Sequence, residues 1–210
     1  MAYLGEDAIE FEPLEMDNIG SLGSLVLPQL PRCDDLLVRQ QLGASLREFC
    51  RESDACTMET VAAVSPCRDG RGSQFPFPAT PHGMVVGHIL EVRSDADGEP
   101  VYFEVRRNPY PHVRVSDYLG VDGRVRVLFS VCPKAGGEEC PAWFKERYAE
   151  AIVAGAMNKL LGMANRPWSD PQRAAQYGAT YADAIAEAAY GAHGNEGGPE
   201  FCVPCGGLFM

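Results

Sequence analysis

The chain of 210 residues is 46% hydrophobic, which is enough to bury the core of one medium domain or of two small domains that share a core. Its formal net charge of −11, from 29 acidic and 18 basic residues, argues against a surface that grips nucleic-acid phosphates. No apolar run approaches the roughly 20 residues that span a bilayer, and the first residues lack the basic and apolar stretches of a secretory signal. We therefore expect a protein that is made in the cytoplasm and has no membrane partner.

Residues 1–32 are predicted to form an extended N-terminal arm. They contain Pro13, Pro28 and Pro31 and a glycine-serine segment, and no apolar period persists for more than a few residues. Six acidic residues and no lysine or arginine occur in residues 1–20. We expect such an arm to be ordered only where another surface holds it.

Residues 33–56 carry the first helical pattern. Asp34 or Asp35 is placed to cap the helix, and either carboxylate suits the positive end of the helix dipole. Apolar residues then recur every three or four positions, as they do along one face of an α-helix; they are Val38, Leu42, Leu46 and Phe49. This spacing predicts an amphipathic helix.

Residues 57–140 are predicted to form an inserted β domain. Several segments alternate apolar and polar residues with a period of two, and turn residues separate them about every ten positions. The clearest is GRVRVLFSVCP, in which one face carries Val125, Val127, Phe129 and Val131. The turn SDADGEP resembles part of a calcium loop but lacks the distal glutamate, so we expect a hairpin turn there. The pattern predicts an antiparallel sheet or a small sandwich.

Residues 141–191 return to the helical period and are predicted to complete a helical body with residues 33–56. After Glu150 the first of two helices is apolar nearly all round, which indicates burial on more than one side. Pro167 is expected to end it.

The second of these helices is predicted to begin at Ser169, with Gln172 as its capping-box partner, and to stop at Gly191. Its seam against the preceding helix carries small and aromatic residues at helical spacing: Ala174, Gly178, Tyr181, Ile185 and Ala188. The expected fold is α+β, with an N-terminal helix, an antiparallel helical hairpin, an inserted β domain and extended terminal arms.

The sequence contains few candidate catalytic, metal-binding or cofactor-binding residues. Of eight cysteines, only Cys202 and Cys205 in CVPC have metal or redox spacing, and no second pair lies nearby in the sequence. The four histidines, His82, His88, His112 and His193, show no paired-ligand spacing, and the common catalytic and nucleotide-binding motifs are missing. We expect no catalytic, cofactor or metal site and no enzyme activity. Trp168 is expected either to pack at a hinge or to contact a neighbouring chain.

The order of elements, with WFKERYAEAIVAGA followed by NRPWSDPQRAAQY, resembles the head-to-tail adaptor proteins of tailed bacteriophages, including the tail tubular A or gatekeeper proteins of short-tailed phages. The resemblance covers about residues 34–190 and is most specific over 143–181. The LREFCRES helix followed by the TVAAV strand adds to it.

The resemblance implies a virion protein at the neck of the particle. Such proteins form a ring, commonly a dodecamer, that binds the portal protein, presents a platform for the downstream nozzle or tube protein, and lets genomic DNA pass through without specific binding. It also implies that a terminal arm docks on the portal. Residues 192–210 are the candidate arm, with the apolar anchors Phe201, Val203, Leu208 and Phe209.

Two other hypotheses stay open at this point. The chain could be another virion interaction protein, such as a stopper, a tail terminator or a capsid auxiliary protein. It could also be a zinc or redox protein that uses Cys202 and Cys205.

Overall fold

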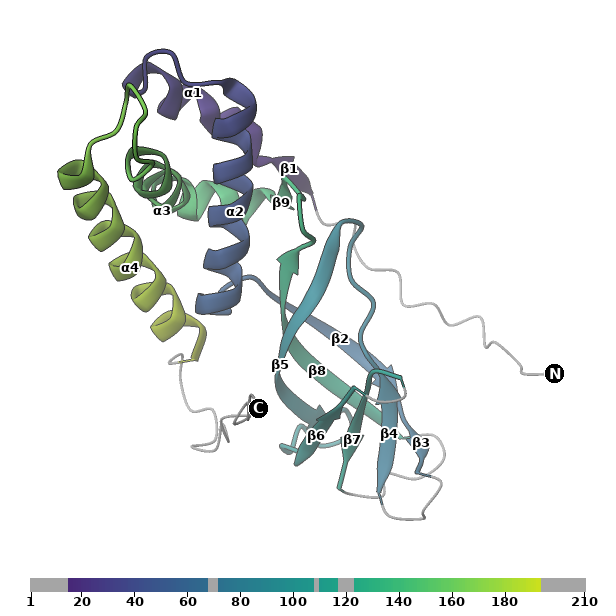
Figure 1. The fold of residues 1–210 in the computed structure, drawn as a ribbon. Helices are drawn as coiled ribbons and strands as arrows, with labels where there is room; N and C mark the ends of the chain where they lie inside the picture. The colour runs from purple at the N-terminus through teal and green to yellow at the C-terminus, as the bar shows by residue number, and fades with distance from the viewer. Residues whose placement is uncertain (1–14, 68–71, 108–109, 117–122, 194–210) are drawn as a thin grey trace.

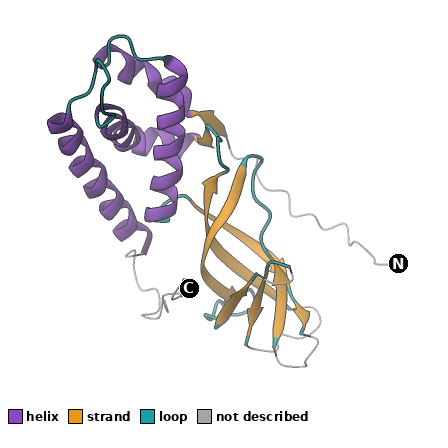
Figure 2. Ribbon diagram, viewed as in Figure 1, coloured by secondary structure: helices purple, strands orange, loops and turns teal. Residues whose placement is uncertain are grey.

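The protein has a mixed α+β fold in which helices gather at one end and antiparallel sheets at the other (Figures 1 and 2). The structure is a computed structural model, and it describes residues 15–67, 72–107, 110–116 and 123–193. The N-terminal helices and the last two helices enclose the sequence that forms the sheets, so the β domain is an insertion between helices.

Residues 15–32 do not form the extended arm that the sequence predicts. They form β1 (Met16–Asn18), η1 (Ile19–Leu22), α1 (Gly23–Val26) and η2 (Leu27–Gln29). Four apolar side chains at spacings of three and four residues are buried in the core: Ile19, Leu22, Val26 and Leu30. The prediction was wrong because glycines and Pro28 divide this segment into short turns, which are stable only through burial against other elements.

Helix α2 (Asp35–Ser53) matches its prediction. Asp34 caps it by accepting a hydrogen bond from the backbone N–H of Leu36 at 3.0 Å. The predicted stripe is buried in full: Val38, Leu42, Leu46 and Phe49. The helix ends at Asp54, whose φ of 52° is left-handed and turns the chain toward the sheets.

The β domain is built from two antiparallel sheets, as the alternation predicted. One has the order β2-β8-β5, from Thr57–Ala63, Arg124–Pro133 and Met84–Ser94. The other has the order β3-β4-β7-β6, from Ser65–Pro66, Ser73–Pro76, His112–Val115 and Phe103–Arg106. The predicted apolar face of β8 is buried: Val125, Val127, Phe129 and Val131. A short third sheet pairs β1 with β9 (Glu139–Pro141) and links the N-terminal segment to the start of α3.

Helices α3 (Ala142–Leu161) and α4 (Pro171–His193) pack closely through their small residues. A Cβ atom on Gly155 would lie 2.7 Å from the Tyr181 ring, and one on Gly178 would lie 3.2 Å from the Asn158 side chain. Later residues of α3 thus meet earlier residues of α4. Burial of Ala174, Tyr181 and Ala188 agrees with the predicted seam.

The ends of these two helices differ from their predictions. Asp170, and not Ser169, caps α4: its carboxylate accepts from the Arg173 N–H at 3.0 Å, since Pro171 takes the first helical position. α3 ends at Leu161, before Pro167, and α4 continues past Gly191 to His193. A Cβ atom on Gly191 would meet no described atom within 4 Å.

Candidate functional site

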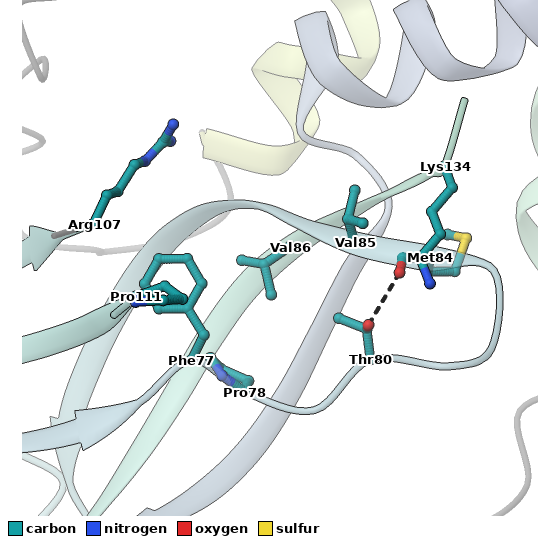
Figure 3. A pocket seen from close by; sticks show the side chains of 9 residues that line it. All are labelled: Phe77, Pro78, Thr80, Met84, Val85, Val86, Arg107, Pro111 and Lys134. Atoms are coloured by element: carbon teal, nitrogen blue, oxygen red, sulfur yellow. Dashed lines mark hydrogen bonds between the residues drawn. The ribbon is translucent and has the colours of Figure 1, made fainter. Parts of the chain in front are cut away.

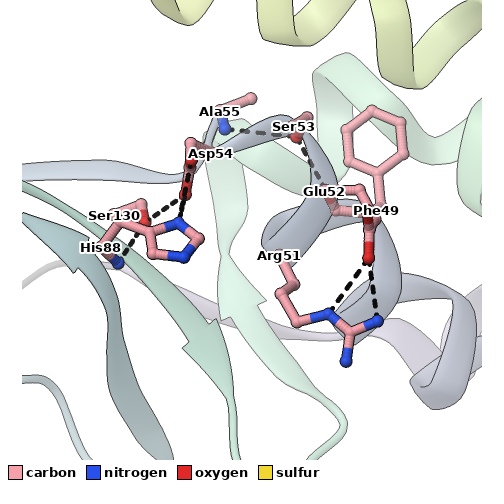
Figure 4. A network of polar contacts seen from close by, with 8 residues as sticks. All are labelled: Phe49, Arg51, Glu52, Ser53, Asp54, Ala55, His88 and Ser130. Carbon is pink, nitrogen blue, oxygen red and sulfur yellow. Dashed lines mark hydrogen bonds and ion pairs between the residues drawn. The ribbon is translucent and has the colours of Figure 1, made fainter. Parts of the chain in front are cut away.

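A polar network joins the end of α2 to the β2-β8-β5 sheet (Figure 4). The Ser130 hydroxyl donates to Asp54 Oδ1 at 2.5 Å, and His88 Nδ1 lies 2.8 Å from the same oxygen. The Ser130 oxygen also accepts the backbone N–H of His88 at 2.9 Å. The Asp54 side chain is 12% exposed and that of His88 is 55% exposed. We call these three residues the Asp54 network.

The Asp54 network has the arrangement of a structural link between elements and not that of a catalytic triad with a nucleophile. In a hydrolase triad the histidine lies between the acid and the hydroxyl and takes the hydroxyl proton. Here the carboxylate lies between the other two, so the Ser130 proton already points at Asp54. A Cβ on Gly87 would lie 2.7 Å from Ser130 Oγ, and the register of β5 shifts between Val86 and Ile89. The bulge therefore brings His88 to Asp54 and fixes the sheet to the helix.

Several of the described cysteines have a raised pKa. A hydrogen bond with the Cys56 thiol, together with burial, raises the pKa of Cys50 well above its ordinary value. Burial raises the pKa of Cys140 to about 12 and also raises the pKa of Cys132. Thiols are reactive and bind metals as thiolates, so these groups stay protonated at neutral pH.

No metal centre is formed by the residues that the structure describes: they contain no group of three or more His, Cys, Asp or Glu side chains placed to hold an ion. Cys202 and Cys205, on which the zinc and redox hypotheses rest, lie outside the described residues. The apolar anchors Phe201, Val203, Leu208 and Phe209 lie outside them as well. Among the described histidines, only His88 belongs to a polar network with an acidic partner.

Trp168 lies half-buried in the loop between α3 and α4 and packs against the hydrophobic core. The guanidinium of Arg166 lies 5.9 Å from its ring centroid. Its indole N–H is buried and has no acceptor among the described groups. The packing of the ring against the core agrees with the first expectation for Trp168, and the contact with a neighbouring chain stays a prediction.

Large apolar side chains are exposed at both ends of the molecule. Leu25 in α1 is 52% exposed and Leu36 at the start of α2 is 61% exposed, at the end of the helices remote from the sheets (Figure 1). Tyr102, which precedes β6, is 68% exposed at the other end, and Tyr110, which precedes the antiparallel strand β7, is 77% exposed at the opposite end of that strand pair. Sequence reasoning missed these residues, although Leu36 lies off the buried stripe of its helix and could have been noticed for that reason.

No family model matches the chain, and no curated protein matches it significantly. In the portion of the chain that the structure describes, no helix has both the length and the apolar character needed to cross a bilayer.

Proposed function

We propose that this chain is a structural head-to-tail adaptor of a tailed bacteriophage, which binds the portal protein on one side and the downstream nozzle or tube protein on the other. The observation that carries the proposal is the exposure of large apolar side chains at two opposite ends, Leu25 and Leu36 among the helices and Tyr102 on the sheets. Exposed apolar groups of this size typically mark contacts with other proteins when they gather at one surface. A connector needs two such surfaces.

The helical body supplies the units of the proposed ring. Gly155 and Gly178 let α3 and α4 approach each other closely, as the two arms of an antiparallel hairpin. A ring of this kind uses two unlike surfaces of each copy and closes by rotation, so it needs no self-complementary patch.

The acidic composition agrees with a conduit for DNA. Each copy has a formal net charge of −11, so the assembled ring repels the phosphate backbone on average. Genomic DNA can then pass without being held.

The deciding experiment mixes the purified chain with portal-bearing heads that lack tails and images them by electron microscopy. We expect a ring of density beneath the portal vertex. The double variant Leu25→Glu, Leu36→Glu should fold but lose this density, because charged groups cannot be buried against the portal without a partner. The control Ala96→Glu adds charge at an exposed turn between β5 and β6 and should attach normally.

Other positions of the density would contradict the adaptor. Binding along the shell of the head would indicate a capsid auxiliary protein, and binding only at isolated tails would indicate a terminator. Heads without added density at saturating protein would also refute the proposal.

A further inference from the structure

Strand β5 has a free edge at its beginning. β5 lies at the edge of its sheet, with β8 as its only partner strand among the described residues. Toward its end, the edge is covered where the N–H of Val101 donates to the carbonyl of Val92 at 2.8 Å. At its start, among the bonds of the described residues, Met84 is bonded on the outer side, to the chain at Thr80 and Pro81.

The direction of the Val86 backbone N–H follows from the pairing of Val86 with β8. Val86 lies opposite Val131, and the N–H of Val131 donates to Cys56 on the far side of β8 at 2.8 Å. Val86 and Val131 are therefore a non-hydrogen-bonded pair, so the N–H of Val86 points away from β8. It is available to an added strand.

A groove of about 570 Å³ lies along this free edge (Figure 3). Its apolar lining includes Phe77, Val86 and Pro111, and Figure 3 shows Arg107 and Lys134 at opposite ends. Neither cation forms an ion pair with a described acidic side chain. The groove thus offers apolar surface between two free positive charges, next to an unused backbone donor.

Residues 6–12, EDAIEFE, have the complementary sequence. They carry four acidic residues and no basic one. In an extended chain Ile9 and Phe11 face one side, with Glu10 and Glu12 on the other. Edge strands bind such segments by backbone hydrogen bonds, while alternate side chains enter pockets.

The segment can reach the groove of its own chain. Glu15 is fixed beside β9, where its carbonyl accepts the N–H of Ala142 at 2.8 Å. β9 lies near the groove, since a Cβ on Gly83, the residue before Met84, would lie 3.7 Å from the Glu139 carboxylate. In an extended chain Glu12 lies within about 10 Å of Glu15 and Glu6 within about 30 Å, so the segment starts beside β9 and can be laid along the nearby start of β5.

We propose that residues 6–12 dock in this groove of the same chain as an added strand on β5. Ile9 and Phe11 face the apolar lining, and the acidic residues face Arg107 and Lys134. The added strand covers an edge that would otherwise pair with other sheets. The inference does not depend on the adaptor function.

Zero-length carbodiimide cross-linking of the full chain tests the contact directly. We expect an amide between Lys134 and Glu10 or Glu12, found by mass spectrometry. Lys134→Arg keeps the charge but removes the amine, so the cross-link should vanish. In an equal mixture of ¹⁵N-labelled and unlabelled chains, each cross-link should join peptides of one isotope. Mixed pairs would overturn the same-chain assignment, and an absent cross-link would overturn the docking.

Hydrogen exchange supplies an independent measurement. The amide of Val86 should exchange at least tenfold faster in the variant Ile9→Asp, Phe11→Asp than in the wild type, while the control Tyr3→Asp, Leu4→Asp should leave it unchanged. Arg107→Glu with Lys134→Glu should also speed exchange, and adding Glu10→Lys and Glu12→Lys should restore slow exchange. Equal rates in all variants would refute the added strand.

Discussion

At Gly155 and Gly87 a single methyl group would collide with a neighbouring side chain. The Cβ on Gly155 would meet the ring of Tyr181 at 2.7 Å, and the one on Gly87 would meet Ser130 Oγ at the same distance. Each glycine is required by a close approach between two elements. In both cases the contact joins segments far apart in the sequence.

Gly155→Ala should therefore destabilise the protein by about 1–3 kcal/mol, because the added methyl overpacks the contact with Tyr181. Glycine to alanine inside an open helix normally stabilises by about 0.5–1 kcal/mol, and this is the result expected for the control Gly191→Ala. Urea unfolding of the two variants measures the difference. A more stable Gly155→Ala variant would show that the ring does not occupy this position.

Ser130→Ala tests the Asp54 network. It removes a donor to a buried carboxylate and the acceptor for the His88 N–H, and should cost about 1–3 kcal/mol of unfolding free energy. The exposed Ser65 side chain donates to the Gln74 carbonyl at 3.3 Å and to no other described group, so Ser65→Ala should change stability by less than about 0.5 kcal/mol. Equal effects of the two substitutions would contradict the role given to Ser130.

Three helices meet at a second polar cluster in the body. The Tyr181 hydroxyl of α4 donates to the Ser45 carbonyl of α2 at 2.6 Å. Lys159 of α3 donates to Glu48 of α2 at 2.6 Å and lies 5.2 Å from the Tyr181 ring centroid. The cluster therefore links α2, α3 and α4 through polar contacts as well as through their apolar faces.

Alkaline pH should weaken this body. Burial, helped by the charge of Glu48, raises the pKa of Tyr181, and burial raises the pKa of Cys140 from its ordinary 9.0 to about 12. The unfolded chain loses these protons at lower pH than the folded protein does. The stabilisation is therefore complete below about pH 9 and is lost as pH rises toward 12.

Urea unfolding under reducing conditions at pH 8 and at pH 10.5 measures this loss. Tyr181→Phe should reduce the pH dependence, whereas Tyr190→Phe, at an exposed position, should leave it unchanged. A stability that stays constant between the two pH values would contradict the buried environment of both groups.

Element by element, the prediction succeeded where one local pattern determines the structure. The buried stripe and the Asp34 cap of α2 lie within one helix, and the alternation in β8 lies within one strand. It failed for η1 and α1, whose few residues become ordered through tertiary burial. It also failed at the cap of α4, where Ser169 and Asp170 are both suitable and the position of Pro171 decides.

For the whole molecule, the proposed adaptor function makes the C-terminal segment the next test. Residues 199–210 include the four anchors Phe201, Val203, Leu208 and Phe209, which are costly to leave in water. Deleting them should leave the melting curve nearly unchanged and abolish attachment to portal-bearing heads.

Two outcomes would change this assignment. Normal attachment of the truncated chain would point to residues 1–14 instead, and loss of folding would place the segment in the core.

The variant Cys202→Ser, Cys205→Ser should attach and melt as the wild type does in the presence of a chelator. A chelator-sensitive melting point in the wild type would favour the zinc hypothesis.

The sequence by itself determined the α+β class, the helix at residues 35–53, the antiparallel character of the inserted sheets and the small-residue seam of the last two helices. Each of these depends on a period or a cap that is complete within a few neighbouring residues. Only the tertiary structure decided that Asp54 meets Ser130 across 76 positions, that the cation-flanked groove opens beside β5, and that Leu36 and Tyr102 are exposed at opposite ends. These features depend on which elements lie side by side, and that choice is made by burial summed over the whole core, which a local pattern does not encode.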